Sequence, residues 1–144
     1  MDREGFACTM LSAVATAYMG EYVAVVVKQL PYAHGSASWQ DGRFIIKLAP
    51  SQLGIGGDSH CDVFWHELAH LKLQHVVKGR QYQEVSSNVG ERKLHAYIWR
   101  QREIDADAEA ARLAAEFERK EGKTLTAWVN GYLKTVNLPT YPTG

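Results

Sequence analysis

The sequence has few cysteines and no excess of either charge. Its 144 residues include two cysteines, Cys8 and Cys61. Two thiols are too few for the disulfide framework that holds small secreted domains together, so we expect both to be reduced. Sixteen Lys and Arg residues balance sixteen Asp and Glu residues. This balance offers no charged surface to nucleic acid or to a membrane, and we expect neither as a direct partner.

The sequence also lacks a long hydrophobic run. The apolar stretch Phe6–Met19 is shorter than the roughly 20 residues of a membrane-spanning helix, and it follows Asp2-Arg3-Glu4 rather than a basic segment. We therefore expect neither a signal peptide nor a membrane anchor, and a cytoplasmic location. The length and the 46% hydrophobic content predict a single domain over residues 1–144 with a core of its own.

The first half of the chain shows the patterns of one helix and several strands. Apolar residues recur at helical spacing over Phe6–Met19, and Tyr22–Val27 is a β-branched run typical of a buried strand. Asp41-Gly42 is a strong hairpin signal between two short arms, 37–40 and Arg43–Leu48. These patterns predict a small antiparallel or mixed sheet of about three strands behind an N-terminal helix.

The second half is predicted to be mainly helical. Helical patterns cover residues 60–77 and 91–120, and Thr124 is suited to cap a last helix whose apolar stripe ends at Val136. Two polar segments without periodicity, 34–38 and 79–90, are expected to be loops. Together the two halves predict an α+β fold.

The segment Trp65-His66-Glu67-Leu68-Ala69-His70 contains an HExxH motif within an apolar helical pattern. Residues four apart on a helix lie on the same face, so His66 and His70 can present two imidazoles to one metal ion. Glu67 lies next to the first histidine, where a carboxylate can hold and deprotonate a water molecule. This arrangement is typical of zinc hydrolases, although five-residue patterns also occur by chance.

A catalytic zinc site needs a third protein ligand, and the predicted helix over 91–120 offers acidic candidates. Glu103 and Asp107 are four residues apart and share a face, whereas Asp105 points to roughly the opposite side. We assign Glu103 as the metal ligand. Asp107 would accept a hydrogen bond from the free ring nitrogen of a ligating histidine. The alternative is an ordinary acidic face in contact with solvent.

Other polar side chains are candidates for stabilising an oxyanion or for contacting substrate, since donors fixed near a reacting carbonyl raise the rate strongly. These candidates are His60, His95, Tyr97 and Arg100. His75 follows His66 at a spacing that puts it about 180° around a continuous helix. We therefore expect His75 to be a surface residue near the helix end and not a ligand.

In two blocks the chain resembles the ImmA/IrrE-type metallopeptidases, a branch of the thermolysin-like gluzincins. One block is Phe64–Leu71, which contains the HExxH motif. The other is Glu103-Ile104-Asp105-Ala106-Asp107, followed by an alanine-rich helix. The order of the predicted elements fits as well. The resemblance implies a minimal zincin-like fold in which the motif helix and a long second helix carry the metal ligands.

The resemblance also implies a site and an activity. It implies one Zn2+ per chain at His66, His70 and Glu103, with Glu67 as the general base. The family usually has Glu where this chain has Asp105, and often Asn where it has Asp107. Asp105 therefore stays open as an alternative third ligand.

The implied substrate is another protein, often a helix-turn-helix repressor of a phage or mobile element. An extended peptide could pair with a sheet edge, for which Tyr22–Lys28 and Arg43–Leu48 are the candidates. The rival hypothesis is a metal-binding interaction protein of the same fold that binds a regulator without cleaving it. Because Glu67 is intact between the histidines, the sequence favours the peptidase.

Overall fold

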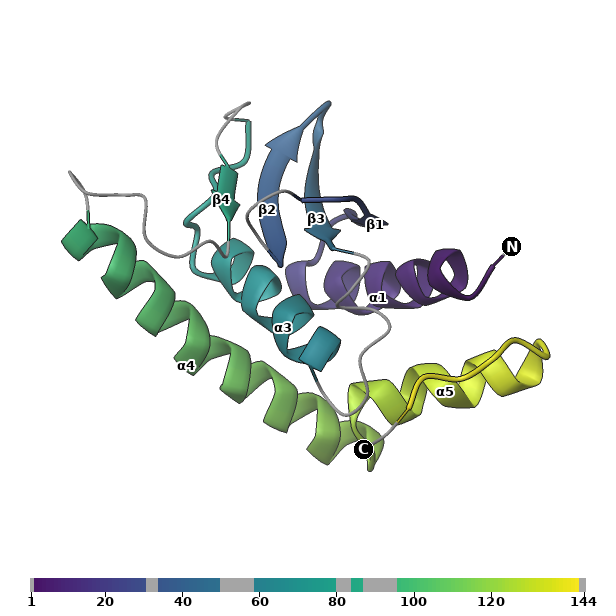
Figure 1. Cartoon of the computed structure of the whole chain (residues 1–144). Coiled ribbons are helices and arrows are strands. Elements are labelled where there is room, and N and C mark those ends of the chain that lie inside the picture. The colour runs from purple at the N-terminus through teal and green to yellow at the C-terminus, as the bar shows by residue number, and fades with distance from the viewer. Residues whose placement is uncertain (1, 31–33, 50–58, 80–83, 87–95, 143–144) are drawn as a thin grey trace.

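The chain folds into one mixed sheet with helices packed along it (Figure 1). The structure is a computed structural model that describes residues 2–30, 34–49, 59–79, 84–86 and 96–142. The predicted α+β class is confirmed. The described elements are α1 (Arg3–Met19), β1 (Val23–Val27), β2 (Gly35–Gln40), β3 (Arg43–Leu48), α3 (Ser59–Lys72), β4 (Glu84–Ser86), α4 (Ala96–Glu121) and α5 (Leu125–Thr135).

The sheet has the strand order β1-β3-β2-β4. β1 runs parallel to β3, and β2 runs antiparallel to both β3 and β4. Asp41 and Gly42 have φ values of 54° and 78°, the positive angles that a two-residue hairpin turn requires. The predicted hairpin is therefore confirmed.

Two predicted loops contain strands. The loop expected over 34–38 is wrong beyond His34, because β2 begins at Gly35 and the side chains of Ser36 and Ser38 are buried. The loop expected over 79–90 contains β4, which pairs with β2 from Ser36↔Ser86 to Ser38↔Glu84. β4 has three residues and is held by backbone pairing to β2, whereas β2 pairs with β3 and β4 and also places Ala37 and Trp39 in the core.

β1 is an edge strand of this sheet, whereas β3 lies between β1 and β2. The hypothesis that Arg43–Leu48 pairs with a peptide is therefore wrong, since both of its edges are already paired. No described strand pairs with the other edge of Tyr22–Lys28, but side chains of α1 bind the backbone at the beginning of this strand. The backbone N–H of Val23 donates to Thr16 Oγ1 at 3.0 Å, and its carbonyl accepts a hydrogen bond from Ser12 Oγ.

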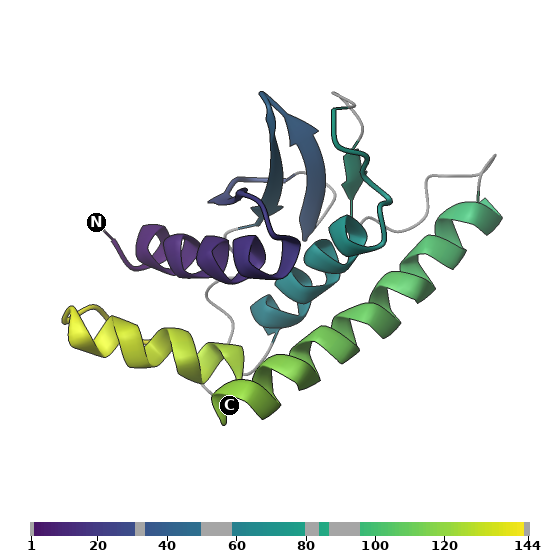
Figure 2. The same cartoon turned by 180° about the vertical axis from the view of Figure 1, so that it is seen from behind.

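The helices form the rest of the core. α1 begins after Asp2, whose side chain accepts from the backbone N–H of Gly5 at 2.7 Å, and it ends at Gly20 with φ 75°. α3 packs against β2 and β3 on one side and against α4 on the other, as both views show (Figure 1 and Figure 2). Among the described helices, none combines the length and the apolar character that a membrane span needs. Their fully buried side chains include Leu11, Phe64, Leu68, Leu71, Leu113 and Leu133.

Cys8 is a free thiol buried where α1 packs into the core. Burial raises the pKa of Cys8 to about 11, so the neutral thiol is the form present near neutral pH. The predicted state of this cysteine is confirmed, whereas the side chain of Cys61 lies outside the described residues.

The amide side chain of Asn130 and the guanidinium of Arg3 hold the segment after α5, and Arg3 donates to the carbonyl of Thr140 at 3.3 Å. Asn130 donates to the carbonyl of Tyr141 at 2.9 Å and accepts from the backbone N–H of Tyr141 at 2.8 Å. Both residues are buried. The amide of Asn130 thus pairs with both backbone groups of Tyr141, as the backbone of a neighbouring strand would.

We predict that Asn130→Ala lowers the free energy of unfolding by about 1–3 kcal/mol, because two buried backbone groups lose their partner. Asn130→Asp keeps an acceptor for the N–H but loses the donor, so it should also destabilise. Denaturant unfolding measures the change, with the exposed residue Lys134 changed to Ala as the control. Equal stability of Asn130→Ala and the control would contradict this role.

Candidate metal centre

Two helices bring the predicted ligands together. His66 and His70 lie one turn apart on α3, and Glu103 lies on α4, which packs alongside. Four residues of α4 lie on the same face as Glu103, at alternating steps of three and four along the helix, and all four are buried. The two nearest to Glu103 are small. Small side chains at these positions allow the two backbones to approach closely. The four residues are Ala106, Ala110, Leu113 and Phe117.

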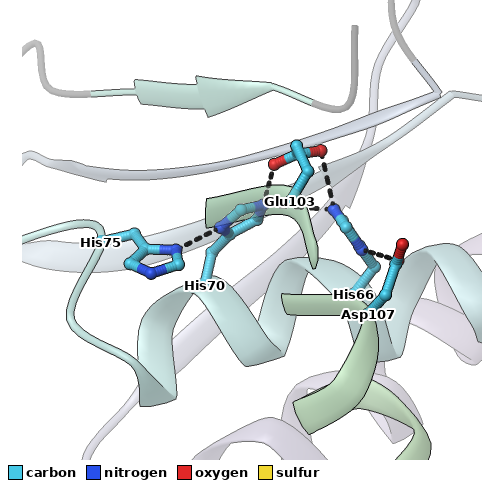
Figure 3. Close-up of polar contacts among 5 residues, drawn as sticks. All are labelled: His66, His70, His75, Glu103 and Asp107. Carbon is cyan, nitrogen blue, oxygen red and sulfur yellow. Dashed lines mark hydrogen bonds and ion pairs between the residues drawn. The ribbon is translucent and has the colours of Figure 1, made fainter. Parts of the chain in front are cut away.

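The carboxylate of Glu103 bridges the two imidazoles (Figure 3). Nε2 of His66 lies 3.0 Å from Glu103 Oε1, and Nε2 of His70 lies 2.8 Å from Glu103 Oε2. The two Nε2 atoms are 3.2 Å apart. Ligands about 2.0–2.1 Å from a tetrahedral zinc ion are about 3.3 Å from each other. Among the described residues, these three therefore form a group that could hold a metal ion.

The group is largely shielded from solvent, and its members shift one another's pKa values. Side-chain exposure is 13% for His66, 0% for His70 and 17% for Glu103. Burial alone raises the pKa of Glu103, but its close contacts with the two histidines prevail and hold the pKa at about 2. Burial alone lowers the pKa of His66, but Glu103, Glu67 and Asp107 together raise it to about 9. A bound cation would take the place of the proton that balances this carboxylate.

Burial also lowers the pKa of His70 below its ordinary value, and the nearby charge of Glu103 opposes this only in part. A neutral imidazole has one ring nitrogen with a free lone pair, which is the form that binds a metal ion. The carboxylate of Glu103 thus contacts two histidines whose pKa values are shifted in opposite directions, upward for His66 and downward for His70.

The acidic residues around Glu103 take different positions. Oδ1 of Asp107 lies 2.8 Å from Nδ1 of His66, so the ring N–H can donate to it as the sequence predicts. Asp105 is exposed and accepts a hydrogen bond from Gln101 Nε2 at 2.9 Å. The geometry thus favours Glu103 over Asp105 as the third member of the group.

Glu67 is completely buried between α3 and β2. A Cβ atom added to Gly35 would lie 3.1 Å from both Cγ and Oε2 of Glu67 and 2.7 Å from Cγ1 of Val63. The first residue of β2 must therefore be glycine for the carboxylate to lie here. Sequence analysis missed Gly35, because nothing in the local pattern shows which helix will pack on the strand.

The remaining candidates are not part of the described group. His95 lies outside the described residues. For His60 and Tyr97 the structure describes the helices that contain them but not their side chains. Arg100 is exposed on the first turns of α4. None of the four gains support as an oxyanion or substrate contact.

His75 lies at the site rather than on the opposite side of the helix. The predicted position of His75 is wrong because α3 ends at Lys72 instead of continuing to Val77. The turn that follows places Nδ1 of His75 2.8 Å from Nδ1 of His70 (Figure 3). No glycine or proline marks this end in the sequence, so the pattern gave no signal for it. The expectation that His75 is not a ligand is not contradicted, since the group that could hold a metal ion does not include it.

Comparisons with known proteins give one structural likeness. No family model and no curated protein matches the chain. A crystal structure of the metallopeptidase zymogen abylysin from Pyrococcus abyssi is similar with 18% sequence identity and a TM-score of 0.34. The match covers 81% of this chain and 97% of that chain. A TM-score this low supports no inference about function.

We predict that Gly35→Ala lowers the free energy of unfolding by about 1–3 kcal/mol, because the added methyl group overpacks the contact with Val63 and Glu67. Gly131→Ala is the matched control. Gly131 lies in α5 with nothing within 4 Å of an added Cβ, so alanine there should stabilise by about 0.5–1 kcal/mol. Denaturant unfolding of both variants tests the contrast, and equal effects would show that Gly35 has room for a side chain.

Proposed function

We propose that the protein is a zinc-dependent metallopeptidase with one Zn2+ per chain, held by His66, His70 and Glu103. The observation that supports this most strongly is the convergence of two Nε2 atoms and a carboxylate within 2.8–3.2 Å of one another, with Glu67 next to His66 in the chain. Two imidazoles and one carboxylate are the protein ligands of many catalytic zinc sites, which keep a fourth position for water or substrate.

The choice of zinc follows from the donor set. Imidazole nitrogen suits zinc and other late transition metals, whereas calcium and magnesium prefer sites made entirely of oxygen ligands. Three donors from two rigid helices, with Asp107 hydrogen-bonded to one of the rings, favour a fixed ion over a loosely held one. When bound, zinc would supply a Lewis acid that lowers the pKa of water and polarises a carbonyl oxygen.

Glu67 would act as the general base. Its carboxylate would take the proton from the water that attacks the peptide carbonyl and pass it to the leaving amine. Burial against Gly35 keeps the side chain of Glu67 in one place, so it does not have to be ordered during the reaction. Asp107 would hold the ring of His66 through Nδ1.

The substrate we propose is a regulatory protein in the cytoplasm, such as a helix-turn-helix repressor of a phage or mobile element. This part of the proposal rests on the resemblance of the blocks Phe64–Leu71 and Glu103–Asp107 to ImmA/IrrE-type peptidases. The groove of about 700 Å³ between β1 and α1 is lined by none of the residues of the metal group, so it does not support a substrate path along the edge of β1.

Metal content tests the ligand set. We expect about one zinc per wild-type chain, loss of zinc in Glu103→Gln, and retention in Asp105→Asn, the matched change two residues away. Zinc at 100 times its dissociation constant should raise the stability of the wild type by about 2.7 kcal/mol. A wild type that takes up no supplied zinc would contradict the proposal, and loss of zinc in Asp105→Asn alone would assign the third ligand to Asp105.

Cleavage of a proteome-derived peptide library tests the reaction. Glu67→Gln should keep its zinc but cleave about 10²–10⁴-fold more slowly, because it removes the general base without removing a ligand. Mass spectrometry of the new termini measures both rates. Equal cleavage by the two proteins would contradict the role of Glu67. A zinc-loaded wild type that cleaves nothing would favour the metal-binding interaction protein.

A further inference from the structure

The end of α3 is a turn that reverses the chain onto the helix. The backbone N–H of Gln74 donates to the carbonyl of Leu71 at 3.1 Å, and that of His75 donates to the carbonyl of His70 at 2.9 Å. Gln74 has φ 60°. These two bonds and the left-handed residue define a Schellman motif, in which the residue after the left-handed one lies over the residue five positions earlier. Here those two residues are His75 and His70.

The two rings are in direct contact (Figure 3). Their Nδ1 atoms are 2.8 Å apart, and the ring centroids are 5.0 Å apart. A hydrogen bond between two imidazole nitrogens needs a proton on one and a free lone pair on the other. Because the side chain of His70 is 0% exposed, bulk water does not reach its ring. His75 is therefore a hydrogen-bond partner for the inner nitrogen of a buried ring.

The other side of the His70 ring determines the direction of this bond. Nε2 of His70 faces Glu103 and Nε2 of His66. For Nε2 to bind a metal ion its lone pair must be free, so the single proton of the neutral ring must be on Nδ1. Nδ1–H of His70 then donates, and Nδ1 of His75 accepts.

We propose that His75 is a positioning residue of the metal centre. Its Nδ1 accepts a hydrogen bond from Nδ1–H of His70, and this bond fixes the tautomer of His70 that presents Nε2 to the metal ion. This inference rests on the proposed function. Under this proposal each histidine of the motif has a hydrogen-bond partner at its Nδ1 atom. Asp107 on α4 holds the ring of His66, and His75, from the turn after α3, holds the ring of His70.

Removal of such a partner typically weakens metal binding about 10–100-fold. We expect His75→Ala to lose zinc affinity by this factor, measured by competition with a chromophoric chelator. His75→Asn should recover most of the affinity, because its side-chain oxygen can stand where Nδ1 stands and can accept the same bond. Gln74→Gly is the matched control, since glycine suits φ 60° and keeps the turn.

Two further measurements distinguish a role of His75 in positioning the His70 ring from a role in stabilising the fold. Unfolding of each variant in excess chelator shows what His75 contributes to the fold without metal. The visible spectrum of the Co2+-loaded proteins reports the ligand geometry, and we expect it to change in His75→Ala but not in His75→Asn or Gln74→Gly.

The outcomes are distinct. Weak zinc binding by His75→Ala with recovery in His75→Asn supports the proposal, even if both variants are less stable than the wild type. If His75→Ala binds zinc as tightly as the wild type, the proposal is overturned. An equal loss of zinc affinity in His75→Ala and His75→Asn overturns it as well. A wild type that binds no zinc overturns the proposed function itself, and this inference with it.

Discussion

The carboxylate of Glu103 between two imidazoles is the interaction on which the arrangement of the molecule depends. Its contacts of 3.0 and 2.8 Å join α4 to α3, so the two helices must lie close together where Glu103 faces the HExxH motif. Ala106 and Ala110 on α4 make that approach sterically possible, and Leu113, further along the same face, is completely buried. The carboxylate and the ring of His66 are largely buried and the ring of His70 is completely buried, so separating these polar groups would be costly.

The remaining elements keep α3 in place. β2 and β3 support one side of the helix, and the close contact at Gly35 fixes Glu67 against the sheet. Beside His66, the ring of Trp65 packs against Tyr18, Phe64 and Phe117, with centroids 5.2–5.8 Å apart. Aromatic contacts of this kind come from three different helices and leave the motif little freedom to rotate. The donors are thus held by rigid elements rather than by loops, as a site that binds one ion in one geometry requires.

Sequence alone predicts the parts of this structure that local chemistry determines. Asp41-Gly42 specifies a turn with two positive φ angles, and the i, i+4 spacing of Glu103 and Asp107 places both near the motif helix. It cannot predict what depends on partners far away in the chain. β4 has three residues and exists through pairing with β2, and the end of α3 depends on Gln74 taking a left-handed conformation that usually belongs to glycine. The wrong expectation for the position of His75 follows from that one missing signal.

His66 and Glu103 are separated by 37 positions in the sequence, yet their side chains are in contact. An ion bound to both would close a loop of that size in the same way as a covalent cross-link. By the chain-entropy estimate for cross-links, closing such a loop restricts the unfolded chain by about 4 kcal/mol. Much of the cost of bringing α4 to α3 is therefore the entropy cost of joining distant segments of the chain. A bound ion would hold α3 and α4 together as a cross-link does, so metal occupancy and the stability of the fold would rise and fall together.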